Sequence, residues 1–99
     1  MMNDSQIELS IVIPCLNEED TVGTCIDKAF SNLKKLKISG EVILSDNGSS
    51  DNSVSIAKSK GAKIINVKNK GYGAALKTGI EISKGKYILF ADADNSYDF

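Results

Sequence analysis

The alternation of short apolar runs with segments of helical periodicity constrains the fold of this chain more than any other feature of the sequence. Four runs are rich enough in apolar and β-branched residues to predict strands: residues 9–13, 41–45, 62–67 and 86–91. Three intervening segments carry apolar residues at helical spacing: residues 22–36, about 51–60 and about 74–84. Strands joined through helices run parallel, with right-handed crossovers. We therefore predict an α/β fold, a Rossmann-like parallel sheet with the element order βαβαβαβ.

Boundary signals accompany this pattern. Asn17 is the predicted N-cap of the first helix, because the three acids after it would be favourable at the positive end of the helix dipole. Gly61 is predicted to lie just past the second helix, and Gly85 is predicted to stop the third. Lys68 to Gly73, which contains Gly71-Tyr72-Gly73, is predicted to form a loop.

Composition excludes several classes of function. The formal net charge is −1 and all 12 cationic residues are Lys, which argues against nucleic acid as a partner. The 99 residues, one small domain or part of a larger one, contain no His. The two Cys residues therefore cannot complete a zinc site, and we interpret them as reduced thiols. The longest apolar run, Ile11 to Leu16, is far shorter than the ~18 residues of a membrane span. What remains is carboxylate chemistry.

The acids concentrate where a parallel sheet would place its ligands. Every loop that follows a strand emerges at the carboxyl edge of such a sheet. Eight of the 13 acids fall in these loops: Glu18, Glu19, Asp20, Asp46, Asp51, Asp92, Asp94 and Asp98. Because like charges repel, a divalent cation or a hydrogen-bonding ligand would stabilise them there. For Glu19, Asp20 and Asp51, the ordinary preference of acids for turns and helix starts explains their positions equally well.

Asp92-Ala93-Asp94 is the most specific feature of this set. It follows an apolar strand, in a place where Asp is a poor strand residue. In an extended backbone, residues i and i+2 point to the same side, so both carboxylates can hold one hard cation.

Glycine motifs for phosphate binding are missing from the expected places. The first turn after a strand, Pro14 to Glu18, contains no glycine, which argues against a dinucleotide-binding fold. The P-loop pattern is also absent from the sequence. If phosphates bind, a metal and lysines such as Lys68 or Lys70 must neutralise their charge.

Taken together, these residues resemble the family 2 glycosyltransferases, which have the GT-A fold. The branch that they resemble most includes the dolichol-phosphate mannose and glucose synthases. Four motifs in the family's order carry the resemblance, from about Leu9 to the last residue: Ile13-Pro14-Cys15-Leu16-Asn17-Glu18, Asp46-Asn47-Gly48-Ser49-Ser50-Asp51, Gly71-Tyr72-Gly73-Ala74-Ala75-Leu76, and Gly85 to Phe99 with the D-x-D at its centre.

The resemblance implies an enzyme that moves a sugar from a UDP- or GDP-linked donor to an acceptor, such as a polyprenyl or dolichyl phosphate or a glycan. The nucleotide-binding residues that it implies are Pro14, Leu16 and Glu18 around the base and ribose, Asp46 as an acceptor for the base, and Asp92. Lys70 joins this set because its charge would neutralise the phosphates. Asp92 and Asp94 would bind Mg²⁺ or Mn²⁺. Asn47 stands where the family often has a second acid, and no ligand role is assigned to it.

In this family, the acceptor site and the proposed catalytic base lie downstream of the metal motif. We therefore expect residues 1–8 to be a tail and residues 9–99 to be the nucleotide-sugar-binding half of a GT-A domain, truncated after the D-x-D motif. Such a piece would contain no catalytic base, would be inactive alone, and would expose a sheet edge through which it self-associates. The expected location is cytoplasmic, at the cytoplasmic face of a membrane.

Two alternatives stay open at this point. One is a haloacid dehalogenase-type phosphatase, in which a D-x-D also follows a strand, although normally the first strand. The other is a stand-alone α/β module that binds a nucleotide or a metal.

Overall fold

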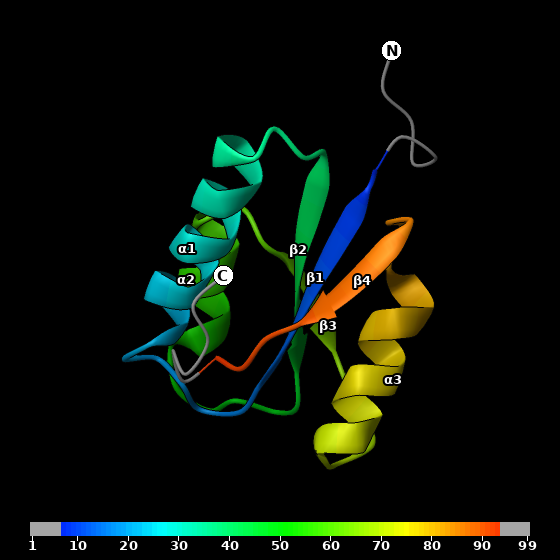
Figure 1. Ribbon diagram of the computed structural model, residues 1–99. Coiled ribbons are helices and arrows are strands. Elements are labelled where there is room, and N and C mark those ends of the chain that lie inside the picture. Colours follow the sequence, from blue (N-terminus) through cyan, green and yellow to red (C-terminus); the bar gives the residue numbers. More distant parts are fainter. Residues whose placement is uncertain (1–6, 94–99) are drawn as a thin grey trace.

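A computed structural model describes residues 7–93 as a four-stranded parallel sheet with helices on both faces (Figure 1). The elements follow in the order β1 (Leu9–Cys15), α1 (Val22–Lys35), β2 (Gly40–Asp46), α2 (Ser53–Ser59), β3 (Lys63–Asn66), α3 (Tyr72–Ile82) and β4 (Tyr87–Phe90). The order across the sheet is β3-β2-β1-β4, and all three pairings are parallel. The predicted βαβαβαβ arrangement is confirmed.

The main core lies between the sheet and the two helices on one face. In Figure 1, α1 and α2 lie together on one side of the sheet and α3 lies on the other. Alternate residues of β1 and β2, such as Ile11 and Leu44, pack against Val22 and Ile26 of α1 in this core. Both central strands are covered on both faces, which explains why their sequences are nearly continuous apolar runs.

Helix α3 packs closely against the opposite face at Gly79. A Cβ at this position would collide with the side chain of Val12 and lie 2.7 Å from the Oγ of Ser45. Both residues are fully buried, so there is no open space into which they could move. Gly79 therefore fixes the distance between α3 and the centre of the sheet.

The helix boundaries differ from the prediction in two places. α1 begins at Val22 with Thr21 as its N-cap, so the N-cap prediction for Asn17 is wrong. The intervening residues form a turn instead, in which the carbonyl of Glu18 accepts hydrogen bonds from the N–H groups of Thr21 and Val22. α3 begins at Tyr72 rather than at about Ala74, so the last two residues of the predicted loop, Tyr72 and Gly73, belong to its first turn.

The two glycines predicted to end helices have different roles. Gly61 follows the C-cap of α2 with φ of 97°, and its N–H donates to the carbonyl of Lys58, as predicted for a residue past a helix end. Gly85 does not stop α3, because that helix already ends at Ile82. A Cβ at Gly85 would lie 2.5 Å from the backbone nitrogen of Ser10, so this glycine allows β4 to enter close to β1.

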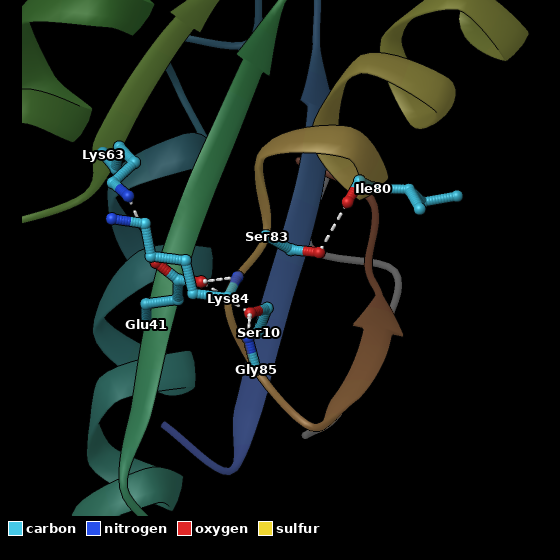
Figure 2. A network of polar contacts seen from close by, with 7 residues as sticks. All are labelled: Ser10, Glu41, Lys63, Ile80, Ser83, Lys84 and Gly85. Atoms are coloured by element: carbon cyan, nitrogen blue, oxygen red, sulfur yellow. Dashed lines mark hydrogen bonds and ion pairs between the residues drawn. The ribbon is translucent and has the colours of Figure 1, made fainter. Parts of the chain in front are cut away.

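A polar network at the amino edge of the sheet holds the connection between α3 and β4 (Figure 2). The carboxylate of Glu41 accepts a hydrogen bond from the Ser10 hydroxyl at 2.6 Å and another from the Lys84 N–H at 2.7 Å. Lys63 pairs with its second oxygen at 3.4 Å, and the Gly85 N–H donates to the Ser10 hydroxyl at 2.8 Å. Burial alone would raise the pKa of Glu41, but these donors together lower it.

β4 forms one edge of the sheet. Within residues 7–93 it pairs only with β1, and all four of its residues are exposed, from 38% for Phe90 to 65% for Tyr87. Ile7 and Glu8, from the expected tail, accept hydrogen bonds from the backbone of Lys86 and Tyr87 at its start. An edge strand of this kind leaves backbone N–H and C=O groups unpaired on its outer side, where another strand could pair. None of the described helices is long and apolar enough to cross a bilayer.

Candidate functional site

A cavity of about 530 Å³ opens at the carboxyl edge of the sheet, where the four loops meet. Residues from all four of these regions line it: Pro14 and Cys15 at the end of β1 with Leu16 and Glu18 just after it, Asn47 and Gly48 after β2, Lys70, Gly71, Tyr72 and Ala75 around the start of α3, and Asp92 and Ala93 after β4. The predicted convergence of the loops is therefore confirmed. Five of the predicted site residues line the cavity: Pro14, Leu16, Glu18, Lys70 and Asp92. Asp94 lies outside the described residues.

Asp46 is placed beneath the turn after β2 and is not part of the cavity lining. It is the last residue of β2 and is only 4% exposed. One carboxylate oxygen accepts hydrogen bonds from the N–H groups of Gly48 and Ser49 at 3.2 and 2.9 Å, and the other accepts from the Ser49 hydroxyl at 2.5 Å. Asp46 therefore shapes the turn that carries Asn47 and Gly48 into the cavity.

Asn17 joins the loop after β1 to the loop after β2. It adopts a left-handed backbone conformation, with φ of 53°, which Asn tolerates better than most residues. Its side-chain oxygen accepts hydrogen bonds from the N–H groups of Ser50 at 2.7 Å and Asp51 at 3.3 Å. Its own N–H donates to the Ser49 hydroxyl. The side chain is thus used between loops, which is why it does not cap α1.

For Asp51, the structure favours the local explanation. One of its oxygens accepts from both the N–H and the hydroxyl of Ser53, in the first turn of α2, and the other accepts from the N–H of Glu19. These hydrogen bonds, the Ser53 hydroxyl first among them, lower the pKa of Asp51. Asp51, Glu19 and Asp20 are absent from the cavity lining.

Cys15 contributes a neutral, largely apolar surface to the cavity. It is 3% exposed, and burial raises the pKa of its thiol above the ordinary value. Both cysteines are free, in agreement with the interpretation of reduced thiols.

The segment after β4 is anchored to α1 and α3. The Ala93 carbonyl accepts a hydrogen bond from the Thr21 hydroxyl at 2.6 Å, and the thiol of Cys25 lies 3.5 Å from the carbonyl of Asp92. The Tyr72 hydroxyl donates to a carboxylate oxygen of Asp92 at 3.1 Å. These contacts hold the Asp92 side chain at the rim of the cavity.

Asn47 connects the loop after β2 to the start of α3. Its side-chain N–H donates to the carbonyl of Asn69 at 2.9 Å, and its side-chain oxygen accepts from the N–H of Gly71 at 2.7 Å. Sequence reasoning assigned no role to Asn47 and treated Tyr72 only as part of a motif. The sequence signal was weak, because the partner of Asn47 is 24 residues away and that of Tyr72 is 20 residues away.

The charged groups of the lining fit a metal that arrives with a phosphate ligand. Glu18 and Asp92 supply carboxylate oxygens, and Lys70 supplies the one positive charge among the described lining residues. Over the range 7–93, no three potential ligands gather in one place, so these residues do not form an all-protein metal cage. Mg²⁺ and similar ions are commonly held by one or two carboxylates together with substrate phosphates, and Asp92 is suited to that arrangement.

The fold and the cavity define an α/β domain with a carboxylate-bearing cavity at the carboxyl edge of its sheet. Residues 10–99 match the sequence profile of Glycosyl transferase family 2, and the chain belongs to this family. The resemblance stated from the motifs is thereby confirmed, and the family membership favours the transferase over the phosphatase alternative.

Among curated proteins, the chain is 42% identical over 91 residues to the low-salt glycan biosynthesis hexosyltransferase Agl6 of Haloferax volcanii, covering 92% of this chain and 22% of the relative. It is 37% identical over 105 residues to human dolichyl-phosphate beta-glucosyltransferase, covering 93% of this chain and 32% of the relative. The chain thus spans between about a fifth and a third of the length of these relatives.

Solved structures show the same fold. The mannosyl-3-phosphoglycerate synthase of Rubrobacter xylanophilus superposes with a TM-score of 0.82 at 26% identity, over 89% of this chain and 31% of that one. The glucosyl-3-phosphoglycerate synthase of Mycobacterium tuberculosis, solved with Mn²⁺, UDP and glucosyl-3-phosphoglycerate, superposes with a TM-score of 0.74 at 29% identity, over 91% of this chain and 34% of that one. The four-stranded sheet is therefore the sheet found in part of these GT-A synthases.

Proposed function

We propose that the cavity at the carboxyl edge binds the UDP- or GDP-linked sugar donor of a glycosyltransferase whose acceptor is a polyprenyl or dolichyl phosphate. The observation that carries this proposal is the meeting of four loops around one cavity that holds two carboxylates and one lysine. A cavity of about 530 Å³ is of the size that nucleotide-sized ligands occupy. The relative of known structure that was solved with UDP and Mn²⁺, and the relatives named for dolichyl phosphate, support the same assignment.

The proposed roles follow from position in the cavity. Pro14 and Leu16 present apolar surface to the base and ribose, and Glu18 offers its carboxylate to polar groups of the nucleoside. Leu16 is 52% exposed, so its side chain is available to a ligand. Lys70 faces the same cavity, and its positive charge suits the diphosphate.

Asp46 keeps a proposed role as an acceptor for the base. Its two oxygens already accept three hydrogen bonds from the turn, and an ionised carboxylate has about four acceptor positions. The proposal requires the remaining acceptor position to receive an N–H of the base. Its larger contribution is to hold the turn in shape.

Asp92 and Asp94 are the proposed ligands of Mg²⁺ or Mn²⁺. When bound, the metal would supply electrostatic stabilisation of the charge that develops on the leaving diphosphate. The chain's own part is to hold the Asp92 carboxylate at the rim, through Tyr72, and to place Lys70 near the phosphates.

We propose that residues 1–99 bind the donor without transferring the sugar. No acceptor site or general base has been assigned to any described residue. A lipid-phosphate acceptor would place the enzyme at the cytoplasmic face of a membrane, and the relatives that act on dolichyl phosphate support this location.

We also propose that the isolated 99 residues associate with a second copy through β4. An antiparallel pairing centred on Leu89 would use the free edge and bury the exposed apolar side chains of both copies. The same pairing would set Lys86 of one copy opposite Asp92 of the other, so the charges at the two ends are complementary.

Calorimetric titration of UDP and GDP, with and without Mn²⁺, tests the donor site. The wild type is expected to bind one of the two nucleotides, and to bind it more tightly with Mn²⁺ present. Asp92→Asn is expected to abolish the effect of Mn²⁺. Asp27→Asn is the matched control, because Asp27 is an exposed acid of α1 that pairs with Lys60 away from the cavity. Failure to bind either nucleotide, or an unchanged metal effect in Asp92→Asn, would overturn the proposal.

A further inference from the structure

Two side chains without an assigned role form a continuous connection from the loop after β2 to Asp92. Asn47 binds both sides of the segment that precedes α3, through the carbonyl of Asn69 and the N–H of Gly71. Tyr72, the next residue, donates its hydroxyl to the Asp92 carboxylate. All of these groups lie along the wall of the same cavity, except Asn69.

Within this connection, the backbone conformation at Gly71 requires a glycine. Its backbone has φ of 116° and ψ of 156°, a conformation that is essentially restricted to glycine. A Cβ there would meet no atom within 4 Å, so the glycine is needed for its backbone conformation and not for space. The hydrogen bond from the Gly71 N–H to Asn47 fixes this conformation, and with it the direction in which α3 and Tyr72 begin.

The chemistry of Asn47 is matched to its two partners. An amide both donates and accepts, as the Asn69 carbonyl and the Gly71 N–H require. An Asp at this position could still accept from Gly71, but it would direct a second acceptor toward the Asn69 carbonyl. Asn47→Asp therefore removes the hydrogen bond to the Asn69 carbonyl and keeps the one from the Gly71 N–H.

Tyr72 acts on one oxygen of Asp92 and leaves the rest of the carboxylate available. An ionised carboxylate has about four acceptor positions, so a single hydroxyl does not block coordination of a cation. Carboxylates that ligate metals are commonly held by hydrogen bonds of this kind, which orient them before the metal binds. Tyr72 is 57% exposed, so its packing against the rest of the described chain is minor.

We infer that Tyr72 and Asn47 are positioning residues for the donor site: Tyr72 orients the Asp92 carboxylate for the metal, and Asn47 holds the segment from which Tyr72 starts. This inference rests on the proposed function, because it assigns Asp92 to the metal. The hydrogen bonds themselves can be tested without any ligand.

The ligand-free test is amide hydrogen exchange measured by NMR at Gly71. Asn47→Ala is expected to speed exchange of the Gly71 amide at least about tenfold, whereas Asn47→Asp is expected to retain most of the protection. Asn52→Ala is the control, because Asn52 precedes α2 without a side-chain cap hydrogen bond. Unchanged exchange at Gly71 in Asn47→Ala would show that Asn47 does not hold this segment.

The ligand test compares Tyr72→Phe with Tyr87→Phe, which removes the same hydroxyl from an exposed tyrosine on β4. Tyr72→Phe is expected to weaken Mn²⁺-dependent UDP or GDP binding about 5- to 30-fold and to leave metal-free nucleotide binding unchanged. In the Asp92→Asn background the same substitution should have no effect. Equal losses with and without metal, no loss, or tighter binding would overturn the inference. A wild type that binds no nucleotide would instead refute the proposed function, and the Gly71 exchange would still report on Asn47.

Discussion

Glu41 provides the sharpest test of how the sheet is held together. Its carboxylate receives hydrogen bonds from Ser10 and from the Lys84 N–H, and its side chain is 12% exposed. Hydrogen bonds to a charged group contribute about 1.5–3 kcal/mol each, whereas the ion pair with the half-exposed Lys63 contributes at most about 1 kcal/mol. Gln keeps one acceptor oxygen and loses the charge. We therefore expect Glu41→Gln to cost about 1.5 kcal/mol of unfolding free energy and Glu41→Ala about 3 kcal/mol.

Urea denaturation followed by circular dichroism measures these differences at pH 7. For a domain of this size, 1 kcal/mol corresponds to about 4–8 °C in Tm, so thermal unfolding gives an independent reading. Glu81→Gln is the matched control, because Glu81 is an exposed acid on α3. A Glu41→Gln variant as stable as the Glu81→Gln variant would refute the reasoning.

The pH dependence of the unfolding free energy of wild type and Glu41→Gln tests whether the charge of Glu41 stabilises the fold. The folded-state pKa of Glu41 lies below its ordinary value of 4.5, so the stabilisation is complete above that value. It is lost as the pH falls through the folded-state pKa. The stability gap between wild type and Glu41→Gln should therefore stay constant from neutral pH to about pH 5.5 and narrow at lower pH. A gap that widens on acidification would contradict this account.

Two further predictions concern packing and association. Gly79→Ala is expected to lower the unfolding free energy by about 1–3 kcal/mol, because its Cβ would enter a closely packed contact with the sheet. Gly73→Ala, with no atom near its Cβ, should be neutral or stabilising by up to about 1 kcal/mol. Urea denaturation measures both, and equal effects would contradict the close approach of α3. Leu89→Lys is expected to reduce concentration-dependent association of the 99-residue chain in sedimentation velocity, because a charge on an edge strand opposes pairing. Leu36→Lys, at an exposed leucine after α1, is the control, and an equal reduction by both variants would remove β4 as the association surface.

The strands and their common edge could be predicted because their signals are local. A buried parallel strand needs a run of apolar residues, and the connection through a helix fixes the direction of the next strand. The loops that line the cavity follow from that geometry alone. This is why Pro14, Glu18 and Asp92 could be placed at one edge from the sequence.

The polar contacts within the site could not be predicted in the same way, because their partners are distant in sequence. The local sequence around Asn17 predicts a helix cap. Its side-chain oxygen instead accepts hydrogen bonds from the N–H groups of Ser50 and Asp51, which are 33 and 34 residues away. The sequence predicts that Asp46 lies in a loop, available to a ligand. In the structure its carboxylate accepts three hydrogen bonds from donors of its own turn. For short polar side chains, a local pattern fixes the hydrogen-bonding capacity but not which partner fulfils it.

The most direct test of the donor site is a map of amide chemical-shift changes when UDP or GDP is added with Mg²⁺ to the ¹⁵N-labelled chain. The account predicts changes concentrated in the four loops around the cavity, at Leu16, Gly48, Lys70 and Asp92, with the amino edge around Glu41 unaffected. Changes confined to the amino edge, or no changes with either nucleotide at millimolar concentration, would contradict the assignment of the carboxyl-edge cavity to a nucleotide-sugar donor.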